Sequence, residues 1–277
     1  MLGAIIGDLA GSIYEFDQVK KHRDIKIKNI IEDNAFYSDD TILTIAIADA
    51  IINNKDYGQT LKQYAHKYGD KVPKSIPYFK TMFSPNFLKW ANSNTLGESS
   101  GNGAMMRISP VGYLFNNEED IIKNSYLATS PSHNTKEAVD SATKIALIIF
   151  YSRNGLSKEE IIKKLGLEIK KPKIDKFNYT CSDTIDICLY SLFNSNTFDD
   201  NIRLAISFGG DTDTNACIVG SMAEAMYGIP KELKQQALKK LPKEFIDILN
   251  KCYSQILGNE MMAIWTFGMS SGDYMDF

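Results

Sequence analysis

Residues 38–52, with the sequence SDDTILTIAIADAII, predict a helix at the centre of the fold. A serine is a good helix cap, and two aspartates in the first turn suit the positive end of the helix dipole. The rest of the segment is apolar on nearly all sides, which indicates a helix buried all round. Its polar start, Ser38, Asp39 and Asp40, therefore leads directly into a long apolar stretch.

Two further segments predict helices with small residues along one face. Gly3, Gly7 and Gly11 recur every four residues, so on a helix they stack on one face and let another helix approach closely. Close helix packing by itself is enough to explain this glycine pattern. Residues 215–227 predict a second such helix, and Gly228 with the nearby Pro230 ends it. The small residues on its stripe are Ala216, Val219, Gly220 and Ala223.

The remaining pattern is also helical. No alternation typical of strands runs for a useful length, so we predict an all-α fold. Residues 72–103 are instead rich in proline, serine, asparagine and aromatic residues, which is typical of a lid or a mobile loop. Further helices are expected at 86–92, 135–151, 158–165, 182–194, 201–207, 231–241 and 244–257.

Composition narrows the class of protein. Of the 277 residues 44% are hydrophobic and 23% charged, the balance of a folded soluble chain rather than a disordered one. A formal net charge of −3 gives no strongly basic footprint, so a nucleic-acid binder is not expected. Four cysteines without CxxC spacing favour neither disulfides nor a zinc cage. The opening residues lack a basic start and carry Asp8, and no apolar run spans a membrane, so we expect a cytoplasmic protein.

Two acidic segments carry the chemistry. Residues 38–41 (SDDT) and 210–214 (GDTDT) each place two carboxylates before a long apolar stretch. Capping explains one or two of these groups, whereas four would repel one another unless cations neutralise them. Oxygen ligands select hard cations, Mg²⁺ first, with Mn²⁺ or Ca²⁺ as alternatives. Asp211 and Asp213 converge only if the backbone there is still a loop, and an EF-hand fails because Met222 replaces its bidentate glutamate.

A second group of residues could line a substrate pocket. The glycine-rich run comprises Ser99, Ser100, Gly101, Asn102 and Gly103, and its backbone amides could approach a phosphate or a ribose, although a plain turn is the alternative. Arg107 could clamp a phosphate or serve the structure. His133 could stack on a ring, hydrogen-bond a sugar, or help to cap the helix at 135.

Five stretches in order resemble one known family, the ADP-ribosylglycohydrolases, which remove ADP-ribose from modified proteins and small acceptors. They are GAIIGDLAGSIYEF, YSDDTILTIAIADA, SGNGAMMRISPVG, SHNTKEAVDSA and AISFGGDTDTNACIVGSMAEAMYGIP, and they span roughly residues 1–240. The resemblance implies a single orthogonal helical bundle with two Mg²⁺ ions in a cleft. The implied metal ligands are Ser38, Asp39, Asp40, Asp211, Asp213 and Thr214, and the implied catalytic residues are Glu15 and Asp40. The implied ADP-ribose contacts are Ser99 to Gly103 and His133.

The resemblance therefore predicts a Mg²⁺-dependent hydrolase that cleaves the glycosidic bond at the distal ribose and releases ADP-ribose, with an N- or O-linkage. An inactive ADP-ribose binder and a metal hydrolase acting on a phosphodiester are the alternatives. The first acidic segment departs from the family pattern, which begins with threonine where this chain has Ser38. The family-like helical domain is expected at 1–258, followed by a tail of unknown role at 259–277. We expect a monomer whose partner is an ADP-ribosylated protein or small molecule, with nucleic acid only as a modified substrate.

Overall fold

The regular structure of the protein is helical, as the sequence predicts. The computed structural model describes residues 1–15, 27–73, 80–173 and 176–257. Among these residues there is no strand, only two isolated β-bridges, which confirms the all-α prediction. The helices are α1 (Leu2–Gly11), α3 (Asp39–Ile52), α4 (Tyr57–Tyr68), α5 (Pro85–Ala91), α6 (Gly103–Met106), α7 (Ser109–Leu114), α8 (Glu118–Thr129), α9 (Lys136–Arg153), α10 (Lys158–Leu165), α11 (Cys181–Phe193), α12 (Phe198–Ser207), α13 (Thr212–Tyr227), α14 (Lys231–Lys240) and α15 (Lys243–Leu257).

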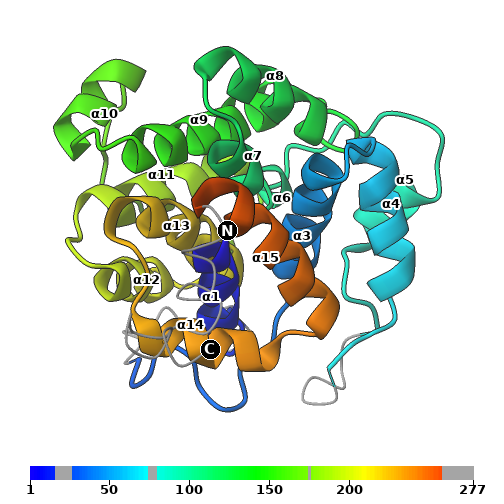
Figure 1. Cartoon of the computed structure of the whole chain (residues 1–277), viewed down its shortest axis with the longest axis horizontal. Coiled ribbons are helices and arrows are strands. Elements are labelled where there is room, and N and C mark those ends of the chain that lie inside the picture. Colours follow the sequence, from blue (N-terminus) through cyan, green and yellow to red (C-terminus); the bar gives the residue numbers. More distant parts are fainter. Residues whose placement is uncertain (16–26, 74–79, 174–175, 258–277) are drawn as a thin grey trace.

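Helices α1 and α13 form the centre of the bundle, and α3 packs beside them (Figure 1). Every residue of α1 is buried. The glycine face of α1 lies directly on the backbone of α13. A Cβ added at Gly7 would lie 1.9 Å from the carbonyl oxygen of Ala216. A Cβ added at Gly3 or Gly11 would likewise lie 2.2 Å from a carbonyl oxygen of α13. The close approach that the glycine spacing predicts is therefore confirmed, and only glycine permits it at these positions.

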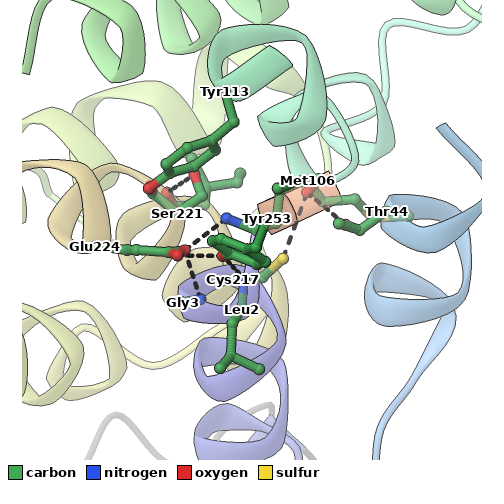
Figure 2. A network of polar contacts seen from close by, with 11 residues as sticks. Leu2, Gly3, Thr44, Met106, Tyr113, Cys217, Ser221, Glu224 and Tyr253 are labelled. Atoms are coloured by element: carbon green, nitrogen blue, oxygen red, sulfur yellow. Dashed lines mark hydrogen bonds and ion pairs between the residues drawn. The ribbon is translucent and has the colours of Figure 1, made fainter. Parts of the chain in front are cut away.

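Polar contacts fix the start of α1 against α13 and α15 (Figure 2). Glu224 on α13 accepts hydrogen bonds from the amide of Gly3 at 2.8 Å and from the hydroxyl of Tyr253 on α15. It also pairs with the backbone ammonium of Met1 at 2.5 Å, and Tyr253 accepts from the amide of Leu2 at 2.9 Å. These groups lie inside the bundle, where an unpaired charge is costly, so the carboxylate holds three helices in register.

Amphipathic helices cover this centre. The apolar spacing did not predict α4, α6, α7 and α8. Of these, α6 and α7 are short and α8 buries mostly small or polar residues, whereas α4 does bury Leu61 and Tyr68. The helices that the sequence predicts are all present, with ends that differ by a few residues. No described helix has a stretch both long and apolar enough to cross a bilayer. The tail at 259–277 lies outside the described residues, so its role and the domain boundary before it stay predictions.

Candidate functional site

A cavity of about 780 Å³ opens where the first turns of α3 and α13 meet. Its floor carries both acidic segments, from Ser38 to Asp40 and from Asp211 to Thr214. The glycine-rich run lines one wall together with His133, and the segment that contains α5 lines another. A volume of this size is typical of a pocket for a drug-sized or cofactor-sized ligand. The sequence could not establish this meeting of distant segments.

A first group of carboxylates joins three helices. Oxygen atoms of Asp8 on α1, Asp40 on α3 and Asp213 on α13 all lie within 4.8 Å of one another. Asp8 Oδ2 accepts hydrogen bonds from the amides of Ser38 at 2.9 Å and Thr41 at 3.1 Å, so α1 caps the start of α3. The close packing of α1 on α13 therefore also sets the distance between Asp8 and Asp213.

A second group shares one member with the first. Oxygen atoms of Glu15, Asp211 and Asp213 also lie within 4.8 Å of one another. Asp211 precedes the first residue of α13 and has non-helical backbone angles, after Gly209 and Gly210 with φ of 73° and 72°. The prediction that Asp211 and Asp213 converge through a loop-like backbone is confirmed. Asp213 is a member of both groups, so its carboxylate can contribute to either one.

Burial makes these carboxyl groups hard to ionise together. Burial and then the neighbouring Asp213 raise the pKa of Asp8 to about 7 and that of Asp39 to about 8. The same causes, with Asp211 next, raise the pKa of Glu15 to about 10. The pKa values of Asp40 and Asp211 are also raised well above the ordinary range, with burial as the first cause and Asp213 as the second. A cluster of this kind holds either protons or cations.

The donor set fits a hard divalent cation. Asp8 Oδ1 and Asp40 Oδ1 are buried and accept no hydrogen bond from any described residue. Such orphaned anionic oxygens are costly unless a cation satisfies them. All the donors are oxygens, and neither histidine nor cysteine belongs to the two groups, which suits Mg²⁺, Mn²⁺ or Ca²⁺. Two groups of three carboxylates that share Asp213 offer room for two ions.

Hydroxyl groups complete the floor around Asp40. Ser38 Oγ donates to Asp40 Oδ2 at 3.1 Å, and Thr214 Oγ1 donates to the same oxygen at 3.2 Å. Ser38 Oγ also accepts from the amide of Asp40, so it is the helix cap that the sequence predicts. Asp39 lines the cavity but belongs to neither group of three. The six residues predicted as metal ligands therefore lie on one floor, where Asp40, Asp211 and Asp213 belong to the converging groups.

The glycine-rich run is anchored on both sides. Asn102 donates its amide to the carbonyl of Tyr179 at 2.9 Å, and Cys181 donates its amide to the carbonyl of Ser100 at 2.8 Å. The side chain of Asn102 donates to Asp211 Oδ2 at 2.7 Å, which ties the run to the acidic floor. Of the five predicted residues, Ser100 is absent from the cavity lining, whereas the other four line it. The predicted ADP-ribose contacts stay a prediction.

His133 faces the cavity from the loop before α9, within a small buried network. The cap of α9 is Thr135, whose hydroxyl accepts from the amide of Ala138, so His133 does not cap that helix. His133 Nδ1 lies 2.7 Å from Ser132 Oγ, and Ser132 Oγ accepts from Arg107 Nη2 at 2.7 Å. Arg107 is 1% exposed. It holds the only guanidinium among the lining residues, and it lies beneath the pocket wall rather than at its mouth.

Aromatic residues form the opposite wall. Phe83, Phe87 and Trp90 pack ring against ring, with centroids 5.4 and 5.2 Å apart, and all three line the cavity. These residues belong to the segment 72–103, which the sequence predicts as a lid or a mobile loop and of which residues 74–79 lie outside the described residues. Tyr179, which is 62% exposed, also lines this cavity.

Sequence reasoning missed Asp8 as part of the site. A charged residue in the middle of a wholly apolar helix is itself unusual, because an aspartate is rarely buried without a partner. That signal was present in LGAIIGDLAG, where Asp8 is the one ionisable group. Asn178 was also missed: it accepts from the amide of Asp211 at 3.0 Å and lies where a side chain on Gly210 would clash.

Comparisons with known proteins agree with this fold and site. The profile of the ADP-ribosylglycohydrolase family matches residues 1–260. The ADP-ribosylarginine hydrolase Tri1 of Pseudomonas putida is 23% identical over 89% of this chain and 76% of its own length. The ADP-ribosylhydrolase ARH3 of Danio rerio is 24% identical over 83% of this chain and 82% of its own.

A solved structure of an ADP-ribosylglycohydrolase-related protein complex superposes with a TM-score of 0.63 at 19% identity. It covers 97% of this chain and 96% of that one. At this identity the likeness supports the fold alone. The match of the family profile to almost the whole chain extends to the glycine face of α1 and to both acidic segments. The chain belongs to the ADP-ribosylglycohydrolase family.

Proposed function

We propose that the protein is a Mg²⁺-dependent hydrolase that cleaves the glycosidic bond at the distal ribose of ADP-ribosylated substrates and releases ADP-ribose. The observation that carries this proposal is the pair of carboxylate groups that share Asp213, whose members except Asp8 line a ligand-sized cavity. Family membership and the activities named for the relatives, on ADP-ribosylarginine and ADP-ribosylated substrates, support the same reaction.

Two sets of residues would hold the cations. Asp8, Asp40 and Asp213 would hold one, and Asp211 and Asp213 the other, with Glu15 beside them and with Ser38 and Thr214 as hydroxyl neighbours of Asp40. When bound, divalent cations lower the pKa of a coordinated water and orient the ribose hydroxyls. We favour Mg²⁺, with Mn²⁺ as a substitute, because all the donors are hard oxygens.

Glu15 is the group we assign to proton transfer. Its pKa is raised to about 10 by burial and by Asp213, so without cations its carboxyl holds a proton at neutral pH. Cations that neutralise the neighbouring carboxylates would lower that pKa, and a carboxyl group poised in this way can both give and take a proton. Glu15 then protonates the departing acceptor atom or takes the proton of the attacking water, depending on whether the leaving group departs as an amine or an alkoxide.

Asp40 is the group we assign to charge stabilisation. Cleavage of a glycosidic bond develops positive charge on the ribose ring, and a nearby carboxylate stabilises that charge. Asp40 is 1% exposed, so little water screens it. The glycine-rich run would bind the diphosphate through its backbone amides, and the aromatic wall of Phe83, Phe87 and Trp90 would exclude water from the acceptor side.

A panel of ADP-ribosylated substrates tests the proposal. Arginine-linked, serine-linked and nucleic-acid-linked ADP-ribose are incubated with the protein in Mg²⁺ or in chelator, and free ADP-ribose is measured by chromatography. We expect release from at least one linkage in Mg²⁺ only. Binding of ADP-ribose without turnover of any linkage would instead select the inactive binder. A cut phosphate link with an intact glycosidic bond would select the phosphodiesterase alternative.

Asp213→Asn is the decisive variant. Because Asp213 belongs to both carboxylate groups, its loss should abolish tight binding of both cations in calorimetry and lower turnover by at least about a hundredfold. Asp49→Asn is the matched control, since Asp49 is a buried aspartate of α3 that pairs with Lys55 and lies outside the cavity lining. Equal cation binding by Asp213→Asn and Asp49→Asn would contradict the assignment.

A further inference from the structure

Arg107 is a buried cation that the proposed reaction does not use. It is the C-terminal cap of α6, the short helix that begins at the last residue of the glycine-rich run. No carboxylate pairs with it among the described residues. Only its Nη2 atom makes hydrogen bonds, to Ser132 and toward His133, while Nε and Nη1 reach no described acceptor. Burying an arginine without a carboxylate partner is costly, which indicates that its contacts with Ser132 and His133 have a functional role.

We propose that Arg107 and Ser132 are positioning residues that hold His133 as the neutral tautomer with its proton on Nε2, so that the ring presents a fixed hydrogen-bond donor to the ligand. The inference rests on the proposed function only because it takes the ligand to be ADP-ribose. The tautomer of His133 is a property of the protein without ligand and can be measured there.

The directions of the hydrogen bonds follow from chemistry. A guanidinium has five N–H donors and no acceptor, so Ser132 Oγ must accept the bond from Arg107 Nη2 at 2.7 Å. The hydroxyl hydrogen of Ser132 is then free to point at His133 Nδ1, 2.7 Å away. Arg107 Nη2 also lies 3.4 Å from His133 Nδ1 and can only donate to it. Ser132 Oγ has a second lone pair and is not obliged to donate, but Arg107 Nη2 can only donate, and an N–H on Nδ1 would oppose it. The arrangement therefore favours a lone pair on Nδ1.

The charge of Arg107 disfavours a doubly protonated ring. An imidazolium would place an N–H on Nδ1 against the donor Arg107 Nη2 and a second positive charge beside that guanidinium. Burial first, and then the charge of Arg107, lower the pKa of His133 well below its ordinary value of 6.5. Arg107 stays charged, because burial lowers its pKa only to about 10. The neutral ring therefore carries its one proton on Nε2.

The Nε2 edge of the ring faces the glycine-rich run. A Cβ added at Gly101 or Gly103 would lie 3.5 or 3.4 Å from Nε2, so glycine at both positions leaves the space beside this atom open. No described residue accepts a hydrogen bond from Nε2, and His133 lines the cavity. The N–H at Nε2 therefore has no protein partner and faces open space, where it can donate to an oxygen of a bound phosphate or ribose.

The backbone of His133 is held in place independently of the tautomer. His133 donates its amide to the carbonyl of Thr129 at 2.9 Å and forms an antiparallel bridge with Glu98. The neighbouring carbonyl of Ser132 lies so close to Gly97 that a Cβ there would approach it to 2.3 Å. These contacts fix the backbone of His133, so the role left to Arg107 and Ser132 is to orient the ring and to choose which nitrogen carries the proton.

The tautomer is read in the free protein by NMR at neutral pH. The chain has three histidines, so ¹⁵N labelling of histidine gives three ring systems, and a His133→Gln variant identifies the resonances of His133. We expect a protonated Nε2 and an unprotonated Nδ1 for His133. A protonated Nδ1, or an imidazolium, would overturn the proposal even if the protein hydrolyses ADP-ribosylated substrates. The expected tautomer in a protein without hydrolase activity would leave this inference standing and remove only the proposed function.

Two variants test the part played by Arg107. Arg107→Met removes the charge and the donor with little change in volume, so Ser132 is free to rotate and the two tautomers should mix. The Kd for ADP-ribose should rise about fivefold to tenfold, the worth of one ordered hydrogen bond, while the number of bound cations stays the same. Arg107→Lys keeps a donor-only cation and should restore most of the Nε2–H population.

Arg153→Met is the matched control, because Arg153 is a half-buried arginine whose contacts are to Phe115 and Asn116, outside the cavity lining. It should leave the His133 spectrum and the Kd unchanged. A wild-type tautomer and a wild-type Kd in folded Arg107→Met would refute the positioning role. If Arg107→Met does not fold, the wild-type spectrum and the Arg107→Lys variant still decide the question.

Discussion

The sharpest test of how the fold builds the site is Gly7→Ala. Gly7 lies on the contact between α1 and α13, where an added Cβ would be 1.9 Å from the carbonyl oxygen of Ala216 and 2.3 Å from its carbonyl carbon. Ordinary van der Waals contact begins at 3.4 Å, so the two helices would have to part by about 1.5 Å. The obstacle is backbone, which cannot turn aside as a side chain does.

The expected cost follows from that clash. Overpacking a core costs about 1–3 kcal/mol, and a rigid backbone obstacle places Gly7→Ala at the upper end or beyond. Alanine regains about 1 kcal/mol of helix propensity over glycine, so the net loss in the free energy of unfolding should be about 2 kcal/mol or more. Because Asp8 follows Gly7 directly and Asp213 lies one turn before Ala216, the affinity for Mg²⁺ should also fall about 10- to 100-fold.

Urea denaturation in chelator and calorimetric titration with Mg²⁺ measure the two effects separately. Gly58→Ala is the matched control, because Gly58 lies in the first turn of α4 and a Cβ there would approach side chains rather than backbone, Pro131 at 3.1 Å and Asp56 at 3.4 Å. It should leave the affinity for Mg²⁺ unchanged. A Gly7→Ala protein with the wild-type unfolding midpoint and the wild-type affinity for Mg²⁺ would refute the link between the glycine face and the site.

Two further predictions concern charge inside the bundle. The pKa values of Asp8 and Asp39 are raised from their ordinary 3.8 to about 7 and about 8. In chelator the folded protein therefore holds protons that the unfolded chain has already released. Its free energy of unfolding should fall as the pH rises from the ordinary pKa to the raised pKa values. The gain in Tm on adding Mg²⁺, measured by scanning calorimetry, should therefore be larger at about pH 8 than at about pH 6, and an equal gain at both would contradict the pKa shifts. Glu224→Gln removes the one carboxylate at the start of α1 and should lower the free energy of unfolding by about 3 kcal/mol in urea, whereas the exposed Glu119→Gln should change it by less than about 0.5 kcal/mol. Similar urea midpoints for these two variants would show that the network at α1 contributes little.

Local patterns carried much of the fold. The cap and apolar body at Ser38, and the glycine spacing at Gly3, Gly7 and Gly11, are short-range signals that a linear sequence displays in full. The helix α8 was missed because it buries mainly small or polar residues, and α6 and α7 were missed because they are too short to show a period. The helix α4 was missed although it buries Leu61 and Tyr68. Apolar periodicity detects a helix only when that helix buries an apolar face.

The chemistry of the site could be anticipated in kind. Four carboxylates at two helix starts exceed what capping needs, so oxygen ligands for a hard cation followed from residue types alone. Which oxygens converge did not follow, and Asp8 was missed because its partners Ser38 and Thr41 lie about 30 residues away. The family resemblance supplied the expectation that the two acidic segments meet.

The sequence by itself determined most of the helices that bury an apolar or glycine face, and it determined which oxygen donors are present. Cap preference, apolar spacing and ligand hardness are properties of residues and their neighbours. Only the tertiary structure decided that Asp213 serves two carboxylate groups, that Asn102 supports Asp211, and that Arg107 lies beneath His133. Each of these contacts joins residues tens to hundreds of positions apart. Their distances depend on how closely whole helices pack, which no local pattern encodes.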